Sequence, residues 1–297
     1  MNHTHYALVA SLCLLAPAFA QDDDSGEGYL LEVKPQIGKI YRFKIVEDRN
    51  SERSRAGQVE RHDERVVRIF RIEPTKAEKE GTLCRFELES MVHEVSRGSS
   101  QARYDSNTNP SAKLKRERKV GVPVDFVITP QGRINEIRPV DNKTGVLTPS
   151  DQTEIREGWL RHSLQAMFTP YPTRKMKVGD TWTTTSSSTL AGTTVSFRSQ
   201  NTISEDLGNG RLRIKQDKTS NAKPGGAYRE NKTVGTGDAV YDTADGLLHR
   251  YTLTDEWTAV RLSGVRWERK GKTTVTRLNV EGEDESEEEP KPEDDGK

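Results

Sequence analysis

Alternation of apolar and charged side chains is the feature that most constrains this chain of 297 residues. Apolar and basic side chains alternate over residues 41–45, and a period of two recurs at 66–72, 84–95 and 122–128. Successive side chains of a strand point to opposite faces. The pattern therefore predicts antiparallel strands with one buried face and one charged, solvated face.

Turn residues divide these strands into hairpins. Pro130 and Gly132 lie between two predicted arms at 122–128 and 133–138, where they favour a tight reversal. The dipeptide at 209–210 is Asn-Gly, a strong hairpin signal. A further turn is predicted at 242–246, and other strands are expected at about 181–204, 247–262, 264–270 and 272–280.

One segment has a helical period instead. Ser150 or Asp151 can cap its first turn, and Pro170 ends it. Its apolar stripe consists of Ile155, Trp159, Leu160, Leu164, Met167 and Phe168. We therefore predict a mainly β fold, in which one large, curved antiparallel sheet wraps around a central helix at about 151–168. Two domains divided near residue 145 are the alternative.

The two ends of the chain differ from this body. Residues 1–20 combine a polar start, an apolar run and small residues at Ala18 and Ala20, which predicts a signal peptide cleaved after Ala20. The mature protein is then secreted or periplasmic, and we expect no transmembrane helix in it. A flexible segment at 21–36 and an acidic, disordered tail at 281–297 flank a β-rich domain at 37–280.

The zero net charge is an average over unlike parts. Of 46 basic and 46 acidic side chains, the tail holds two and ten, which leaves 44 and 36 in residues 21–280 and a net charge of +8 there. Five cations lie close together, at Lys113, Lys115, Arg116, Arg118 and Lys119. We interpret this run as a charged edge or loop, with an anion-contact patch for a partner or for the acidic tail as the alternative. It lacks the context of a nucleic-acid site, so no nucleic-acid partner is predicted.

No local motif for catalysis or for metal or nucleotide binding is present in the sequence. In the mature chain Cys84 is the one cysteine, and its alternation with apolar neighbours indicates a buried strand residue. His93 lacks the second histidine of a zinc-protease motif. We therefore predict that the protein is not an enzyme, with no catalytic residues, metal or cofactor. A hydrolase site built from dispersed residues, with His93 or His249 beside a carboxylate, is a third hypothesis.

The order of three segments resembles a known group of proteins. Residues 126–134 precede the predicted helix, and Val178-Gly179-Asp180-Thr181-Trp182 and residues 241–247 follow it. This order resembles an uncharacterised family of secreted bacterial proteins with a V-G-D-[ST]-W signature, similar to the half-barrel fold of periplasmic lipoprotein carriers. The resemblance implies a half-barrel-like sheet but no catalytic residues. Physically, Gly179 and Asp180 suit a turn, and Trp182 suits the core.

Two functions follow from these observations. The first is a non-enzymatic envelope protein that binds a hydrophobic ligand or a lipoprotein in a groove between sheet and helix. The residues expected to line that groove are Trp159, Leu164, Met167 and Phe168. The alternative is an interaction or structural module that binds an envelope protein through its charged faces and acidic tail.

Overall fold

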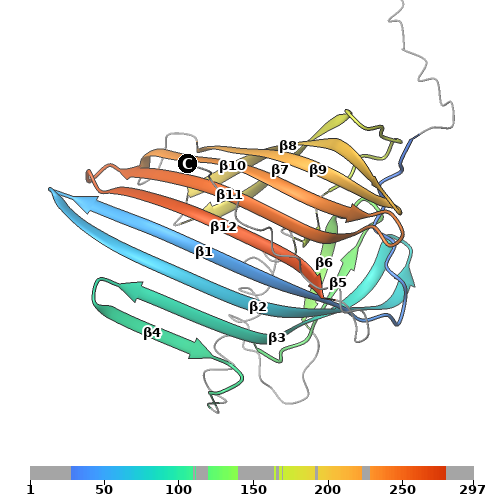
Figure 1. The fold of residues 1–297 in the computed structure, drawn as a ribbon, viewed down its shortest axis with the longest axis horizontal. Helices are drawn as coiled ribbons and strands as arrows, with labels where there is room; N and C mark the ends of the chain where they lie inside the picture. Colours follow the sequence, from blue (N-terminus) through green and yellow to red (C-terminus); the bar gives the residue numbers. More distant parts are fainter. Residues whose placement is uncertain are drawn as a thin grey trace, which may run out of the picture.

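The computed structural model describes residues 28–109, 111, 120–139, 164, 167, 168, 170–190, 193–222 and 228–278. Within these ranges twelve strands form one antiparallel sheet (Figure 1). The strands are β1 (Tyr41–Arg55), β2 (Gln58–Glu78), β3 (Gly81–Arg97), β4 (Ser100–Asp105), β5 (Val124–Ile128), β6 (Ile134–Pro139), β7 (Thr181–Leu190), β8 (Thr193–Gly208), β9 (Arg211–Ala222), β10 (Tyr228–Asp242), β11 (Leu247–Arg261) and β12 (Arg266–Leu278).

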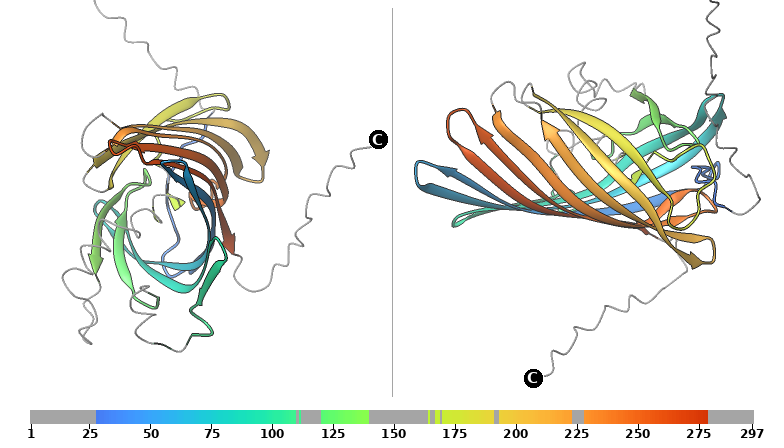
Figure 2. Two further views of the ribbon diagram at one scale, coloured as in Figure 1. Left: turned by 90° about the vertical axis from the view of Figure 1, so that its left-hand side faces the viewer. Right: turned by 90° about the horizontal axis from the view of Figure 1, so that it is seen from above.

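The sheet is open, and its order is β6-β5-β3-β2-β1-β12-β11-β10-β9-β8-β7, with β4 also paired to β3. β1 pairs with β12 from Arg42–Leu278 to Ser54–Arg266, so the two halves of the chain share one sheet. The sheet is strongly curved (Figure 2). The prediction of a mainly β fold with one large antiparallel sheet is therefore confirmed.

The predicted turns are also present. The amide of Gly132 donates to the carbonyl of Thr129 at 2.9 Å, and Asn209 and Gly210 both have positive φ angles, 52° and 74°. Residues 181–204, expected to be strand, form the hairpin of β7 and most of β8. One strand prediction needs correction. The strands expected on either side of Gly271 are a single strand, β12, because this glycine stays in register between Arg49 and Asp255.

The chain before β1 is part of the core. Leu31 and Val33 are buried, and the amide of Val33 donates to the carbonyl of Pro130 at 2.7 Å. The hydroxyl of Tyr241 accepts from the amide of Glu32 and donates to its carbonyl, both at 2.9 Å. The flexible segment predicted at 21–36 is therefore wrong for residues 28–36, because these bonds and this burial fix the backbone.

The predicted central helix at about 151–168 lies almost entirely outside the described residues. Of that range the structure describes Leu164, Met167 and Phe168, all buried, and the amide of Phe168 donates to the carbonyl of Leu164 at 2.8 Å. The elements of the described ranges are all strands, so the helix is not borne out. None of the described segments is a helix long and apolar enough to cross a membrane. The predicted signal peptide and the predicted disordered tail also lie outside these ranges.

Candidate binding site on the inner face

The core-bearing face of the sheet, which we call the inner face, changes character along the strands. Residues directly opposite one another on neighbouring strands project to the same face. On β1 the inward residues Tyr41, Phe43 and Ile45 are buried, whereas the next inward residues are Glu47 and Arg49. We call the first part the apolar half. The second part, the charged half, has as its main inward side chains Glu47, Arg49, Arg53, Glu64, His93, Phe197, Lys218, Asp255, Trp257, Trp267 and Arg269.

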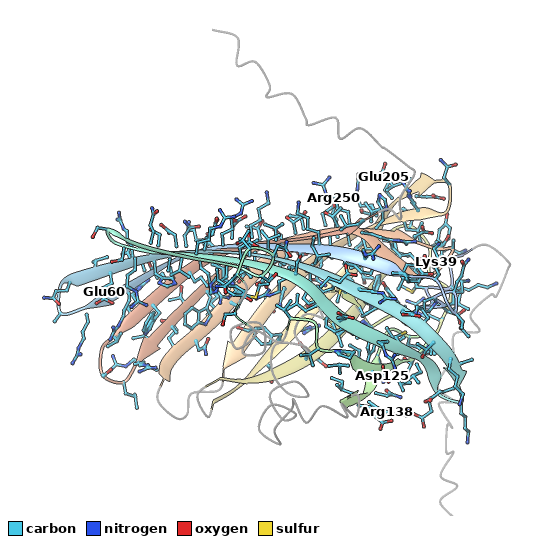
Figure 3. The ribbon with its side chains drawn as sticks, turned by 90° about the horizontal axis from the view of Figure 1, so that it is seen from below. Lys39, Glu60, Asp125, Arg138, Glu205 and Arg250 are labelled. Atoms are coloured by element: carbon cyan, nitrogen blue, oxygen red, sulfur yellow. The ribbon has the colours of Figure 1, made fainter. Side chains whose placement is uncertain are left out.

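Both halves lie on the same long strands. Figure 3 shows Lys39, just before β1, at one end of the sheet and Glu60, near the start of β2, at the other. The change from apolar to charged therefore occurs within single strands and not between separate domains.

A chain of ion pairs crosses β1, β2 and β3 at the start of the charged half. Glu47 accepts from Arg68 at 2.6 Å and lies 3.1 Å from Arg49, which reaches Glu64 at 3.3 Å. The other oxygen of Glu64 lies 2.8 Å from His93 Nε2. Burial opposes ionisation of Glu64, but the charge of Arg49 and the bond to His93 outweigh it and lower the pKa of this carboxyl.

Asp255 occupies the next part of the charged half, on β11 between two glycines. In register its neighbours are Gly235 on β10 and Gly271 on β12. A Cβ on Gly271 would lie 2.6 Å from Asp255 Oδ1, and one on Gly235 would lie 2.9 Å from the carbonyl of Thr254. The two glycines therefore leave the space in which the carboxylate lies, and Arg269 binds that carboxylate at 3.1 Å.

Three half-buried aromatic rings accompany cations in the charged half. Arg269 lies 5.5 Å from the ring of Trp257, and Arg53 lies 5.1 Å from the ring of Trp267. Lys218 Nζ lies 5.0 Å from the ring of Phe197. Such stacking leaves ring edges and cationic groups at the surface, and interface cores are enriched in Trp and Arg.

A row of uncharged polar side chains runs between the two halves. The hydroxyl of Tyr251 donates to Gln216 Oε1 at 2.8 Å, and Gln216 Nε2 donates to Asn201 Oδ1 at 2.8 Å. The Tyr251 ring reaches β9 by crossing Gly237, where a Cβ would lie only 3.0 Å from that ring. Burial raises the pKa of the Tyr251 hydroxyl, so it stays a neutral donor.

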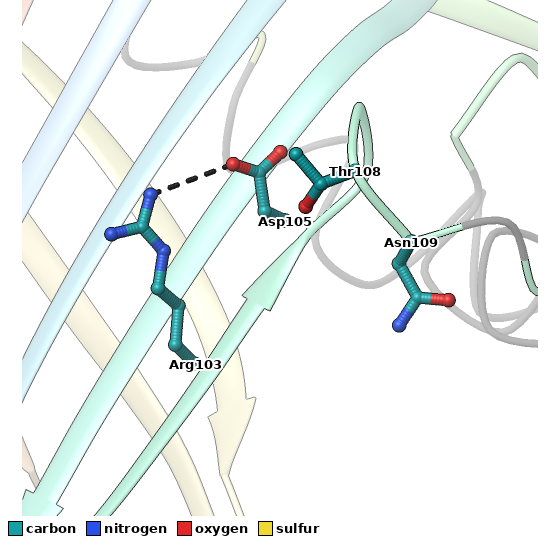
Figure 4. Close-up of a pocket in the computed structure, with 4 residues that line it drawn as sticks. All are labelled: Arg103, Asp105, Thr108 and Asn109. Atoms are coloured by element: carbon teal, nitrogen blue, oxygen red, sulfur yellow. Dashed lines mark hydrogen bonds and ion pairs between the residues drawn. The ribbon is translucent and has the colours of Figure 1, made fainter.

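A separate pocket of about 320 Å³ lies at β4, lined by Arg103, Asp105, Thr108 and Asn109 (Figure 4). Asp105 is already engaged, because it lies 3.5 Å from Arg103 and accepts from the amide of Asn107 at 2.9 Å. The lining is polar, and its charges are paired with one another. It therefore offers little to a hydrophobic ligand.

The sequence-predicted residues fall in different places. Leu164, Met167 and Phe168 are buried in the core of the apolar half, where the ring of Phe168 lies 6.0 Å from that of Phe126. They contact the sheet and expose almost no surface. The predicted groove residue Trp159 and the predicted patch residues lie outside the described residues, the latter being Lys113, Lys115, Arg116, Arg118 and Lys119.

Gly179, Asp180 and Trp182 form a turn and an anchor before and within β7. Gly179 has a φ of 96°, and Asp180 Oδ2 accepts from the amide of Lys177 at 2.9 Å. Trp182 packs against the core and donates from Nε1 to the carbonyl of Pro170 at 3.0 Å. These contacts describe a structural role, in which the turn starts the edge strand β7.

The charged half was missed by the sequence reasoning. The apolar alternation of β1 stops after Ile45, because the next inward residues include Glu47, Arg49 and Arg53. Opposite charges stand at facing positions, such as Arg49 and Glu64. No group of three or more His, Cys, Asp or Glu side chains suited to a metal ion occurs among the residues that the structure describes.

Comparison with known proteins finds no matching family model and no matching curated protein. Among solved structures, one of lipovitellin, concerned with lipid–protein interactions, covers 82% of this chain and 25% of its own, at 12% identity and a TM-score of 0.49. The chain thus spans about a quarter of that lipovitellin chain.

Two further solved structures are also similar. An outer membrane channel of Pseudomonas putida F1 covers 84% of this chain and 98% of its own at 9% identity, with a TM-score of 0.29. The translocator domain of an autotransporter from Neisseria meningitidis covers 86% and 90% at 9% identity, with a TM-score of 0.31. No function follows from similarities at these identities and TM-scores.

Proposed function

We propose that this is a non-enzymatic, secreted or periplasmic protein that binds a hydrophobic or amphiphilic ligand, such as a lipid or the lipid anchor of a lipoprotein. The ligand lies on the charged half of the inner face. The observation that carries the proposal is the set of three half-buried rings, Phe197, Trp257 and Trp267, each beside a cation. Aromatic rings next to guanidinium groups provide both apolar contact and polar anchoring.

This location differs from the groove expected between sheet and helix. The expected lining residues Leu164, Met167 and Phe168 are packed in the apolar half, so their surface is used by the fold. The charged half, by contrast, keeps aromatic surface partly exposed on the same face. A ligand can contact that surface without displacing core side chains.

The alternative, an interaction or structural module that uses its charged faces and the acidic tail, has weaker support from the outer face of the sheet. Outward side chains largely pair with one another, for example Arg42 with Glu89 at 3.0 Å and Arg85 with Asp125 at 3.0 Å. Paired surface charges leave little net attraction for a partner. A hydrolase is the third candidate. His93 lies 2.8 Å from Glu64, as that hypothesis expects, but Arg49 binds the same carboxylate at 3.3 Å and competes with His93 for it.

Native mass spectrometry of the mature protein, purified from the envelope fraction of its own host, tests the proposal. We expect a bound species of lipid-like mass in the wild type and its loss in Trp257→Ala. The matched control is Leu262→Ala, since Leu262 is 63% exposed, next to the end of β11. The absence of a bound species, or equal retention in both variants, would contradict the proposal.

A further inference from the structure

One row of the charged half has charges separated by glycines. Across neighbouring strands the register runs Lys218, Gly235, Asp255, Gly271, Arg49. A cation, a carboxylate and a second cation thus face the same side, with no side chain between them. The Asp255 side chain occupies the space over Gly271 and lies close to Gly235, so one carboxylate stands between the two cations of the row.

The charges of this row are unevenly paired. Arg49 contacts two carboxylates, and Asp255 is bound by Arg269 at 3.1 Å. Among the described residues no carboxylate lies within ion-pair distance of Lys218, whose ammonium group is placed over the Phe197 ring. Lys218, Arg269 and Asp255 together therefore carry one more positive than negative charge.

The Lys218 ammonium group, which has no carboxylate partner among the described residues, is partly shielded from water. Burial disfavours the charged form of Lys218 and lowers the pKa of its ammonium group; the nearby charge of Arg269 acts in the same direction, and Asp255 opposes both. Arg269 Nε is buried and has no hydrogen-bond acceptor among the residues described. An oxyanion between these two cations would offset the desolvation of Lys218 and accept from a guanidinium donor.

An aromatic ring lies beside each of the two cations, Lys218 and Arg269. The ring of Phe197 lies beside Lys218, and the ring of Trp257 lies beside Arg269. The indole N–H of Trp257 donates to Asn231 Oδ1 at 2.7 Å, which fixes the orientation of this ring. A ligand that fits both features has an oxyanion joined to an apolar group.

We propose that Lys218 and Arg269, with Phe197 and Trp257, form a binding site for an anionic amphiphile, whose phosphate, sulfate or carboxylate group lies between the two cations. This inference rests on the proposed function and specifies the chemical class of its ligand. Asp255 positions Arg269 and limits the site to a single net positive charge. Zwitterionic amphiphiles with the same chains bind more weakly there.

The test titrates the full mature protein with monomeric dihexanoyl phosphatidylglycerol, dihexanoyl phosphatidylcholine and inorganic phosphate, followed by calorimetry. We expect the anionic lipid to bind about tenfold more tightly than the zwitterionic one, and phosphate alone to bind more weakly than either. Lys218→Met should remove the preference for the anionic lipid, and Lys218→Arg should keep it. The control Lys215→Met, an exposed position on the opposite face of β9, should change nothing.

The outcomes separate this inference from the proposed function. Equal binding of both lipids, unchanged in Lys218→Met, would overturn the anionic site and leave amphiphile binding standing. Binding of neither lipid would overturn both. Phosphate that binds as tightly as the anionic lipid would overturn the amphiphile assignment, because free anions would then suffice. Circular dichroism of each variant checks that a loss of binding is not a loss of fold.

Discussion

The apolar and charged halves of the inner face share the same strands but are held together by different forces. In the apolar half Phe70 and Phe86 are fully buried, with ring centroids 4.9 Å apart. In the charged half Arg49, Glu64 and Asp255 take corresponding inward positions and form ion pairs. Burying one large apolar side chain stabilises a fold by about 1.5–3 kcal/mol, whereas a partly exposed ion pair contributes about 0–1 kcal/mol.

One continuous sheet can therefore have a region that stabilises the fold and a region that presents a binding surface, at different positions along the same strands. The apolar half supplies most of the folding free energy and fixes the register of the strands. The charged half lies on the same strands and therefore has the same register. Its side chains are thus positioned without forming a core of their own. A binding surface placed there is rigid and yet partly exposed, which suits recognition.

The largest expected effect compares two phenylalanines, one in each half. Phe43 is fully buried, and Phe197 is half-buried beside Lys218. Phe43→Ala should lower the free energy of unfolding by about 3–5 kcal/mol, because it leaves a cavity in the core. Phe197→Ala should lower it by about 1 kcal/mol. Urea denaturation measures both, and equal losses would show that the two halves do not differ in packing.

A second comparison uses two glycines. Gly246 has a φ of 72°, and a Cβ there would lie 1.6 Å from the backbone carbonyl oxygen of Glu32. At Gly271 a Cβ would meet the end of the flexible Asp255 side chain, which can move away. Gly246→Ala should therefore cost about 3 kcal/mol, and Gly271→Ala about 1 kcal/mol.

Thermal unfolding of the two glycine variants tests this difference. A reversed order of melting temperatures would contradict the view that the apolar half is the more tightly packed. It would also question the close contact between the chain before β1 and the turn after β10. In that contact the amide of Lys34 donates to the carbonyl of Asp245 at 2.9 Å, and the amide of Glu32 donates to the hydroxyl of Tyr241 at 2.9 Å.

How much could be predicted from sequence follows the same division. Alternation marks β1 at Tyr41, Phe43 and Ile45, since burial selects apolar residues at every second position. The signal disappears after Ile45, although the strand continues to Arg55, because the inward residues become charged. Hydrophobic periodicity reports burial and not strand geometry, so it could not show the charged half.

Long-range contacts were beyond reach for a different reason. The sheet order places β12 beside β1, and Lys218 near Asp255 and Arg269, by pairings between distant parts of the chain. A single sequence records none of these pairings. The strand-like alternation of Leu31 and Val33 covers only three residues and lies close to the polar residues 21–28. Their burial in the core was therefore not predicted.

A smaller effect is expected for two tyrosine hydroxyls. Tyr241 satisfies both backbone groups of Glu32, whereas Tyr251 donates to the side chain of Gln216. Tyr241→Phe should cost about 1–3 kcal/mol, because two backbone groups lose their partner. Tyr251→Phe should cost about 1 kcal/mol or less, since Gln216 can reorient. Chemical denaturation would refute the contrast if Tyr251→Phe proved the more damaging change.

The smallest effect concerns pH and the charged half. The pKa of Glu64 is lowered because Arg49 and His93 together outweigh its desolvation. A carboxyl with a lowered pKa stabilises the fold above its ordinary pKa, near 4.5, and loses that contribution as the pH falls through the lowered value. Glu64→Gln should therefore reduce stability at pH 7 by about 1 kcal/mol and remove this part of the acid dependence.

The control Glu256→Gln changes an outward carboxylate that is 66% exposed and should leave the pH profile unaltered. Urea titrations between pH 7 and pH 3 compare the three proteins. An unchanged acid dependence in Glu64→Gln would show that the ion pairs of the charged half position its side chains without stabilising the fold.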